Sequence, residues 1–232
     1  MSDFDDDELS EDTGDDLADN PSKRVPVCLC LDTSSSMDGQ PIDELNEGVR
    51  LFYEAVNDDM QAKQCAEVCI VTFGDSGVRV VQDFQSIRGV SAPRFSAGGY
   101  TPMGGGVTEA LNCLERRKQE YKSKGVPYFQ PWFVLMTDGQ PTDSIDSAAQ
   151  RSSGMAKNKK LYIMPIVVSG GDANTLSRFS PINPPLKLQG LNFKEFFKWL
   201  SASVVKTSHS RPGDSLKPLP TDSWSDMGSS DG

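Results

Sequence analysis

Short apolar runs that alternate with amphipathic segments restrict the fold of this chain more than any other feature. Runs of strand length occupy residues 25–31, 67–73, 132–137 and 161–168. Uninterrupted apolar strands are typical of a sheet that is covered on both faces. Helices, most of them with apolar side chains at steps of three and four, are predicted over residues 42–56, 107–124, 145–158 and 192–205. The alternation predicts an α/β fold with an open, doubly wound, mostly parallel sheet and helices on both faces.

One strand of this sheet should be antiparallel to its neighbour. Residues 67–73 and 78–84 flank the sequence Gly-Asp-Ser-Gly, which predicts a hairpin with a short turn. A Gly-rich segment over residues 96–106 is expected to be a loop that leads into the helix beginning at Val107. A further short strand is expected near residues 186–188.

Composition divides the chain into one domain and two tails. Ten acidic residues and no Lys or Arg lie within residues 1–20, and so polar a segment buries too little apolar surface to fold. We therefore predict a disordered acidic tail over residues 1–22, one domain over 23–206 and a disordered Ser/Pro-rich tail over 207–232. Trp224 is the expected exception, because an aromatic residue in such a tail can anchor a short partner-binding segment.

The acidic tail accounts for the whole net charge. The chain has 33 acidic and 23 basic side chains, and the ten acids of the tail leave the remainder formally neutral. Nucleic-acid binding by phosphate neutralisation is disfavoured, because the domain has no basic excess. The N-terminus lacks the basic and apolar regions of a signal peptide, and no run of about 18 apolar residues could span a membrane. These features predict a cytoplasmic protein.

Histidine and cysteine usage excludes several kinds of site. The single histidine, His209, lies near the C-terminus, so His-containing zinc sites and Ser-His-Asp or Cys-His catalysis are excluded from the domain. The five cysteines lie in apolar or helical segments. This pattern favours buried free thiols in a reducing compartment.

Three polar loops lie directly after a strand or before a helix. They are Asp-Thr-Ser-Ser-Ser-Met over residues 32–37, Gly-Gly-Tyr-Thr-Pro-Met over 98–103 and Thr-Asp-Gly-Gln-Pro-Thr-Asp over 137–143. Loops at the carboxyl ends of strands in an open α/β sheet meet at one edge. The oxygen-bearing side chains that could converge there are Asp32, Ser34, Ser36, Thr101 and Asp138. Hard oxygen ligands without nitrogen or sulfur suit magnesium, with manganese as a substitute.

Each loop also has a purely structural interpretation. Asp32 with its serines could cap a helix, and Thr-Asp-Gly is a common turn. The Gly-rich segment could suggest phosphate binding, but it lacks both Gly-x-Gly-x-x-Gly and a Gly-Lys-Ser/Thr end. The joint occurrence of the three loops, each in its strand or helix context, favours a metal site.

Asp-Thr-Ser-Ser-Ser at residues 32–36 resembles the Asp-x-Ser-x-Ser motif of von Willebrand factor A domains. Thr101 and Asp138, in their loops, resemble the remaining parts of that family's metal-ion-dependent adhesion site, and the resemblance covers roughly residues 24–205. Among relatives, the three motifs are most similar to those of bacterial TerY-like proteins, a group associated with tellurite resistance and stress operons. Ser35 is a departure, because relatives usually have Gly there, and a positive φ at this position would carry a cost.

The resemblance implies a non-enzymatic, metal-dependent interaction module whose cation binds an acidic group of a partner protein. A kinase or phosphatase encoded in the same operon is one candidate partner, and neither nucleic acid nor membrane is expected. A rim of residues beside the ligands should contact the partner. This rim consists of Met37, Gln40, Tyr100, Met103, Gln140 and Thr142.

The alternative from another class is a magnesium-dependent phosphohydrolase with Asp32 as the nucleophile. Such enzymes commonly need a second Asp two positions later as the acid/base, and Ser34 occupies that position. Proton transfer would have to rely on hydroxyls and on two carboxylates committed to the metal. The sequence therefore favours the interaction module.

Overall fold

The computed structural model describes residues 17, 20–74, 76–168, 170–210, 219–221 and 225–226. Within these residues, seven strands form one sheet in the order β3-β2-β1-β4-β5-β6-β7. The strands are β1 (Val25–Thr33), β2 (Ala66–Gly74), β3 (Gly77–Ser86), β4 (Trp132–Thr137), β5 (Tyr162–Val167), β6 (Leu186–Leu188) and β7 (Ser225–Asp226).

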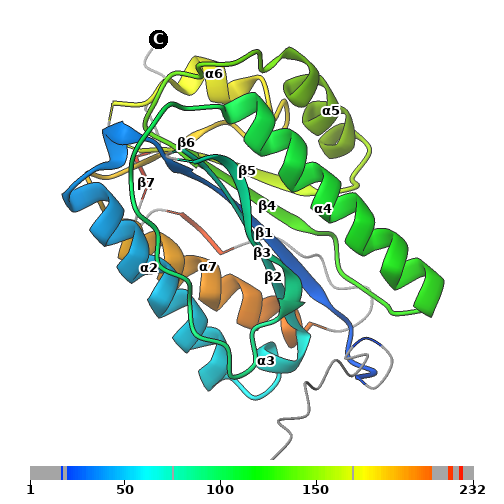
Figure 1. Cartoon of the computed structure of the whole chain (residues 1–232). Coiled ribbons are helices and arrows are strands. Elements are labelled where there is room, and N and C mark those ends of the chain that lie inside the picture. The colour runs from blue at the N-terminus through cyan, green and yellow to red at the C-terminus, as the bar shows by residue number, and fades with distance from the viewer. Residues whose placement is uncertain are drawn as a thin grey trace, which may run out of the picture.

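Helices cover both faces of the sheet (Figure 1). One face carries α2 (Gln40–Asp58), α3 (Ala62–Cys65) and α7 (Phe193–Ser208), and the other carries α4 (Met103–Lys124), α5 (Asp146–Lys157) and α6 (Ala173–Ser177). A single 3-10 turn, η1 (Ser35–Met37), follows β1. The prediction of an open α/β sheet with helices on both faces is confirmed.

The order of the strands determines where a site can form. β1 lies in the interior of the sheet and pairs in parallel with both β2 and β4. The chain therefore winds outward in one direction from β1 to β2 and in the other direction from β4 to β5. Open sheets form their ligand crevice where the winding reverses, at the carboxyl ends of the strands. This point lies just beyond Thr33 and Thr137, the last residues of β1 and β4.

The predicted antiparallel hairpin is present as β2 and β3, which pair from Glu67↔Ser86 to Gly74↔Gly77. A second antiparallel pair, between β6 and the two-residue β7, was not predicted. The short α3 and α6 were also not predicted. α3, α6 and β7 are two to five residues long, and such short elements carry little periodic pattern.

Alternation along β1 separates two halves of the core. Val27 and Leu29 belong to the cluster under α2 and α7, whereas Cys28 and Cys30 belong to the cluster under α4 and α5. Successive side chains of a strand point to opposite faces, so a strand buried on both sides supplies both clusters. All five cysteines are free and buried, as predicted from their apolar surroundings.

The Gly-rich segment forms part of a helix and is not only a loop. α4 begins at Met103, four residues before the predicted start at Val107. A Cβ at Gly104 would lie 2.2 Å from the carbonyl oxygen of Ser144, and one at Gly106 would lie 2.6 Å from the ring of Phe73. These glycines therefore allow the first turn of α4 to pack closely against its neighbours, and this packing outweighs their low helix propensity.

A buried network of charged side chains lies at the end of the sheet where β1 and β2 begin, opposite the carboxyl ends of these strands. Glu67, at the start of β2, accepts hydrogen bonds from Arg24 at 2.9 Å, from Arg117 at 2.7 Å and from the Tyr121 hydroxyl at 2.6 Å. Arg24 and Glu67 are 0% and 1% exposed. Removing one member of such a network leaves a buried charge without its partner, which is strongly destabilising. The network therefore fixes α4 to the first residues of β1 and β2.

Parts of both predicted tails contact the domain. Leu17 is buried against Tyr121 and Val126. The Nε1 atom of Trp199 donates a hydrogen bond of 2.9 Å to the carbonyl oxygen of Leu219, and α7 continues two residues past the expected domain boundary at 206. Trp224, the predicted anchor of the second tail, lies outside the described residues.

We expect Gly48→Ala to destabilise the domain, because α2 and α7 contact each other closely at this glycine. A Cβ at position 48 would lie 2.6 Å from Cδ2 of Phe197, and overpacking of this kind costs about 1–3 kcal/mol. Gly154→Ala in α5 is the matched control, because no heavy atom lies within 4 Å of the position that its methyl group would take. That change should stabilise the protein by about 0.5–1 kcal/mol. Urea denaturation measures both, and equal effects would contradict the packing argument.

Candidate metal site

The three polar loops meet at the carboxyl ends of β1 and β4. Backbone hydrogen bonds join them: Gly98 N donates to the Thr33 oxygen at 2.9 Å, and Thr142 N donates to the Thr101 oxygen at 2.9 Å. The first bond connects the loop after β1 to the loop before α4, and the second connects that loop to the one after β4. The loops thus form one unit although the sequence separates them widely.

Asp32 lies at the centre of this unit. Its side chain is 0% exposed. Oδ1 accepts a hydrogen bond of 2.8 Å from the backbone N–H of Ser34, and Oδ2 accepts one from the hydroxyl of Thr137. The carboxylate is therefore held in one orientation near the carboxyl end of β1.

Two serines connect this carboxylate loop to the second acid. The hydroxyl oxygens of Ser34 and Ser36 lie 3.1 Å apart, and the Ser36 hydroxyl donates a hydrogen bond of 2.6 Å to Oδ1 of Asp138. Ser34 is buried at 2% exposure, whereas Ser36 is exposed and Asp138 is partly exposed. The group is accordingly open to solvent on the side of Ser36 and closed on the side of Asp32.

Thr101 faces the same space from the loop before α4. A Cβ at Gly139 would lie 3.3 Å from Oγ1 of Thr101 and 3.7 Å from Oδ2 of Asp32. The two oxygens thus lie close to the same position, which glycine leaves clear. The structure brings all five predicted residues, Asp32, Ser34, Ser36, Thr101 and Asp138, to one edge of the sheet.

The electrostatics of this group favour a bound cation. Burial raises the pKa of the Asp32 carboxyl, and the nearby charge of Asp138 raises it further, while hydrogen bonds from Ser34 and Thr137 oppose the change. Within the part of the chain that the structure describes, no Lys or Arg forms an ion pair with Asp32. Two carboxylates and three hydroxyls are hard oxygen donors, so these residues fit a magnesium or manganese ion.

A second group of metal-type side chains fits a cation less well. Cys69, Asp83 and Cys113 have ligand atoms within 4.8 Å of one another. However, Arg116 donates to both Asp83 and Cys113, so a positive charge already occupies this place. The hydrogen bond with Cys69 and burial raise the pKa of the Cys113 thiol, which disfavours the thiolate that a metal would need. We assign no metal to this group.

Comparison with known families decides the identity of the fold. Residues 27–194 match the von Willebrand factor type A domain. The chain belongs to the von Willebrand factor type A (vWA) domain family. No curated protein matches the chain in sequence.

Solved structures of other vWA-like proteins share the fold at low sequence identity. The pilus adhesin SpaC of Lactobacillus rhamnosus GG is 14% identical with a TM-score of 0.60, over 80% of this chain and 30% of SpaC. The vWF domain of the type V pili tip protein Mfa5 of Porphyromonas gingivalis is 13% identical with a TM-score of 0.54, over 84% of this chain and 99% of the other. Manganese-loaded TRAP protein of Plasmodium vivax is 16% identical with a TM-score of 0.50, over 77% of this chain and 73% of TRAP. The chain thus spans less than a third of SpaC.

None of the helices in the described residues has the length and apolar character needed to cross a lipid bilayer.

Ser35, the departure from the usual vWA motif, fits its position without backbone strain. Among the described residues other than glycine, Lys159 alone has a positive φ, so the cost considered for Ser35 does not arise. Its hydroxyl donates a hydrogen bond of 3.0 Å to the carbonyl oxygen of Gly99, and its N–H donates one of 3.2 Å to the same oxygen. Ser35 therefore joins two loops of the vWA site, and its hydroxyl is engaged with the Gly99 carbonyl.

Two further residues support the vWA site and were not predicted. Thr137 donates to Asp32. Asp143 accepts hydrogen bonds of 2.9 Å and 2.8 Å from the N–H groups of Gly104 and Gly105 in the first turn of α4. A carboxylate at a helix N-terminus satisfies free N–H groups and interacts favourably with the helix dipole. The sequence did show that Asp143 ends a polar loop that follows a strand. It did not show that this carboxylate would contact the distant helix α4.

The predicted rim is wrong in two residues. Met37 and Met103 are 0% exposed and pack in the two core clusters. They follow polar residues in their loops, but the first turns of η1 and α4 direct both side chains inward. The other four, Gln40, Tyr100, Gln140 and Thr142, are exposed. Tyr100 is 79% exposed and lines a surface hollow together with Gly74, Gly77, Pro102 and Thr142.

We expect Asp143→Ala to destabilise the domain by about 1–2 kcal/mol, because two N–H groups of α4 lose their acceptor. Thr142→Ala is the control, since Thr142 is exposed and its backbone bond to Thr101 does not need the side chain. Urea denaturation of both variants measures the difference. An unfolding midpoint of the Asp143 variant equal to that of the control would show that this carboxylate does not hold α4 in place.

Proposed function

We propose that this vWA domain is a metal-dependent protein-interaction module that binds a carboxylate of a partner protein through a divalent cation. The observation that carries the proposal is the buried carboxylate of Asp32, which has no cationic partner among the described residues and lies in a group of oxygen donors. Burying an unpaired charge costs several kcal/mol. A magnesium or manganese ion held by Asp32, Ser34, Ser36, Thr101 and Asp138 offsets this cost.

The composition of the ligand set explains why an anion would be attracted. Two carboxylates balance the charge of a divalent cation, and the three hydroxyls add no charge. A further carboxylate can therefore approach without strong repulsion, and its contact is stronger where water is partly excluded. The exposed side of the site, at Ser36, is the direction from which this group would arrive.

The surface beside the site suits a protein partner. Tyr100 is a large exposed side chain beside the hollow that Pro102 and Thr142 also line. Tyr is enriched among residues that contribute most to binding energy. Gln40 and Gln140 add polar groups that can donate to a partner's backbone. The fold is shared with a manganese-loaded protein and with pilus adhesins, which is consistent with this proposal.

A more specific hypothesis is that the interaction module acts in bacterial stress response or tellurite resistance. This hypothesis rests on the motif resemblance to TerY-like proteins. In that setting the domain would act in the cytoplasm, and the product of a neighbouring kinase or phosphatase gene would be its partner. Co-purification of the domain with such a protein from the same operon would support this hypothesis.

A phosphohydrolase that uses Asp32 receives less support from the geometry. Asp32 is fully buried, which hinders direct attack on a phosphoester, and Ser34 stands two positions later where such enzymes commonly have an acid/base Asp. Turnover of a generic phosphomonoester with magnesium, lost in Asp32→Asn, would favour the enzyme over the interaction module.

Titration calorimetry with magnesium or manganese chloride tests the metal. We expect Asp32→Ala to abolish binding and Ser36→Ala to weaken it, because each removes a ligand oxygen. Ser35→Ala is the matched control, since this hydroxyl donates to the Gly99 carbonyl and is not one of the five proposed ligands. Free metal at about a hundred times its dissociation constant should also stabilise the wild-type fold by about 2.7 kcal/mol. Equal binding by wild type and the Asp32 variant would overturn the site.

A displayed peptide library with a fixed central Glu tests the partner chemistry, with the corresponding Gln library as its control. Selected Glu peptides should bind in magnesium and lose binding in EDTA or with Thr101→Ala, because the carboxylate needs the cation. Tyr100→Ala should weaken binding by at least about 1 kcal/mol. Circular dichroism checks that each variant is folded. If the folded, metal-free variant binds these peptides as well as wild type does, the metal serves only to join the loops.

A further inference from the structure

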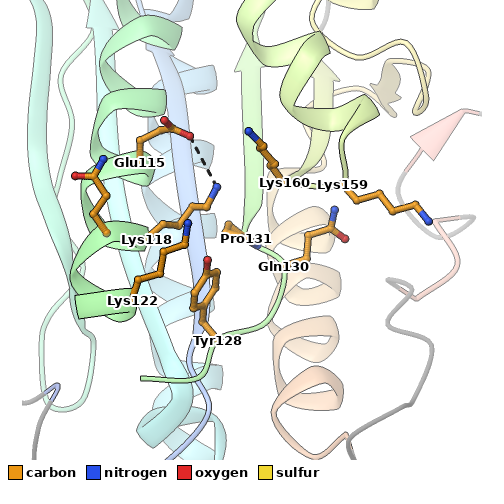
Figure 2. Close-up of a pocket in the computed structure, with 9 residues that line it drawn as sticks. Glu115, Lys118, Lys122, Tyr128, Gln130, Pro131, Lys159 and Lys160 are labelled. Carbon is orange, nitrogen blue, oxygen red and sulfur yellow. Dashed lines mark ion pairs between the residues drawn. The ribbon is translucent and has the colours of Figure 1, made fainter. Parts of the chain in front are cut away.

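A basic hollow lies at the end of the sheet opposite the metal site. It is bounded by the second half of α4, by the segment before β4 and by the turn between α5 and β5. Its lining residues are Glu115, Lys118, Gln119, Lys122, Tyr128, Gln130, Pro131, Lys159 and Lys160. Figure 2 shows Lys118 and Lys122 side by side on α4, Lys160 directed toward them from the start of β5, and Lys159 directed away.

The hollow carries more positive than negative charge. Glu115 is the one acid in its lining, and its Oε1 lies 3.8 Å from Nζ of Lys118. Lys122 and Lys160 form no ion pair with any residue that the structure describes. Burial lowers the pKa of Lys118, and the charges of Lys122 and Lys160 lower it further. Three ammonium groups gathered around one hollow repel one another, and a bound anion would relieve that repulsion.

The N-terminal segment enters the domain beside this hollow. Leu17 is 5% exposed and packs with Tyr121, Val126 and Tyr128. The ring of Tyr121 stacks on that of Tyr128 at 4.9 Å between centroids, and Tyr128 is itself part of the lining of the hollow. Leu17 therefore lies beside the hollow that the lysines line.

The residues that precede Leu17 have the complementary charge. Nine acids lie within residues 3–16, and no Lys or Arg lies within residues 1–20. An extended chain covers about 3.3–3.6 Å per residue, so the acids nearest to Leu17 need only a few residues to reach the lysines. A tether this short gives the segment an effective concentration in the millimolar range.

We propose that the acidic segment of residues 3–16 binds in the basic hollow formed by Lys118, Lys122 and Lys160 of the same chain. Composition alone predicts disorder for this segment, because it offers too little apolar surface to bury. The hollow supplies what the segment lacks, a set of fixed positive charges beside its point of attachment. The contact is electrostatic and weakens as salt screens it.

Zero-length carbodiimide crosslinking of the full chain, followed by peptide mass spectrometry, tests this proposal. At low salt, amide crosslinks should join acids of residues 3–16 to Lys118, Lys122 or Lys160 in preference to Lys198 and Lys206, which are exposed on α7. High salt should reduce their yield. Mixing ¹⁴N- and ¹⁵N-labelled protein distinguishes crosslinks within one chain from those between copies. Equal yields at all exposed lysines, or crosslinks mainly between labelled and unlabelled chains, would overturn the proposal.

A charge-reversed variant adds a matched comparison. Lys122→Glu combined with Lys160→Glu should reduce the yield at the remaining Lys118 at least about fivefold, equal to about 1 kcal/mol. Lys198→Glu combined with Lys206→Glu changes the net charge equally and should leave that yield unchanged. Thermal denaturation confirms that both variants are folded. An equal reduction in both would show that only the overall charge of the domain attracts the segment.

Discussion

Asp32 places a charge that the protein interior disfavours near the carboxyl end of β1, and the loops around it are arranged in response to that charge. The buried carboxylate accepts hydrogen bonds from Ser34 and Thr137, and the second acid, Asp138, is reached through Ser36. Fixed hydrogen bonds keep these oxygens near one another without a cation. If the proposed cation binds here, preorganisation of this kind means that little of the binding energy is used to order the ligands.

The sequence predicted the sheet, and it predicted that five oxygen-bearing side chains would meet at one edge, because both depend on local patterns. Apolar runs marked the strands, and the polar residues at strand ends marked the edge where parallel strands place their loops. The proximity of Asp32 and Asp138 could therefore be predicted although more than a hundred positions separate them.

The parts that were not predicted depend on contacts between distant segments. Gly104 and Gly106 belong to α4 because Ser144 and Phe73 leave no room for a side chain. Met103 points inward because the helix begins there, so the error in the start of α4 also produced the error at Met103 in the rim. Asp143 caps that same turn from another loop. Each case requires knowledge of which segments touch, which a single sequence does not contain.

The buried cysteines have a consequence for how the stability of this domain can be followed. All five are free and enclosed in the core, and burial raises the pKa of the thiols of Cys28 and Cys30, which lie on β1. Thiol reagents attack the exposed thiolate, so they will not reach these side chains while the sheet is intact. The kinetics of labelling thus report how often the centre of the domain opens, and the native chain carries its own probe of unfolding.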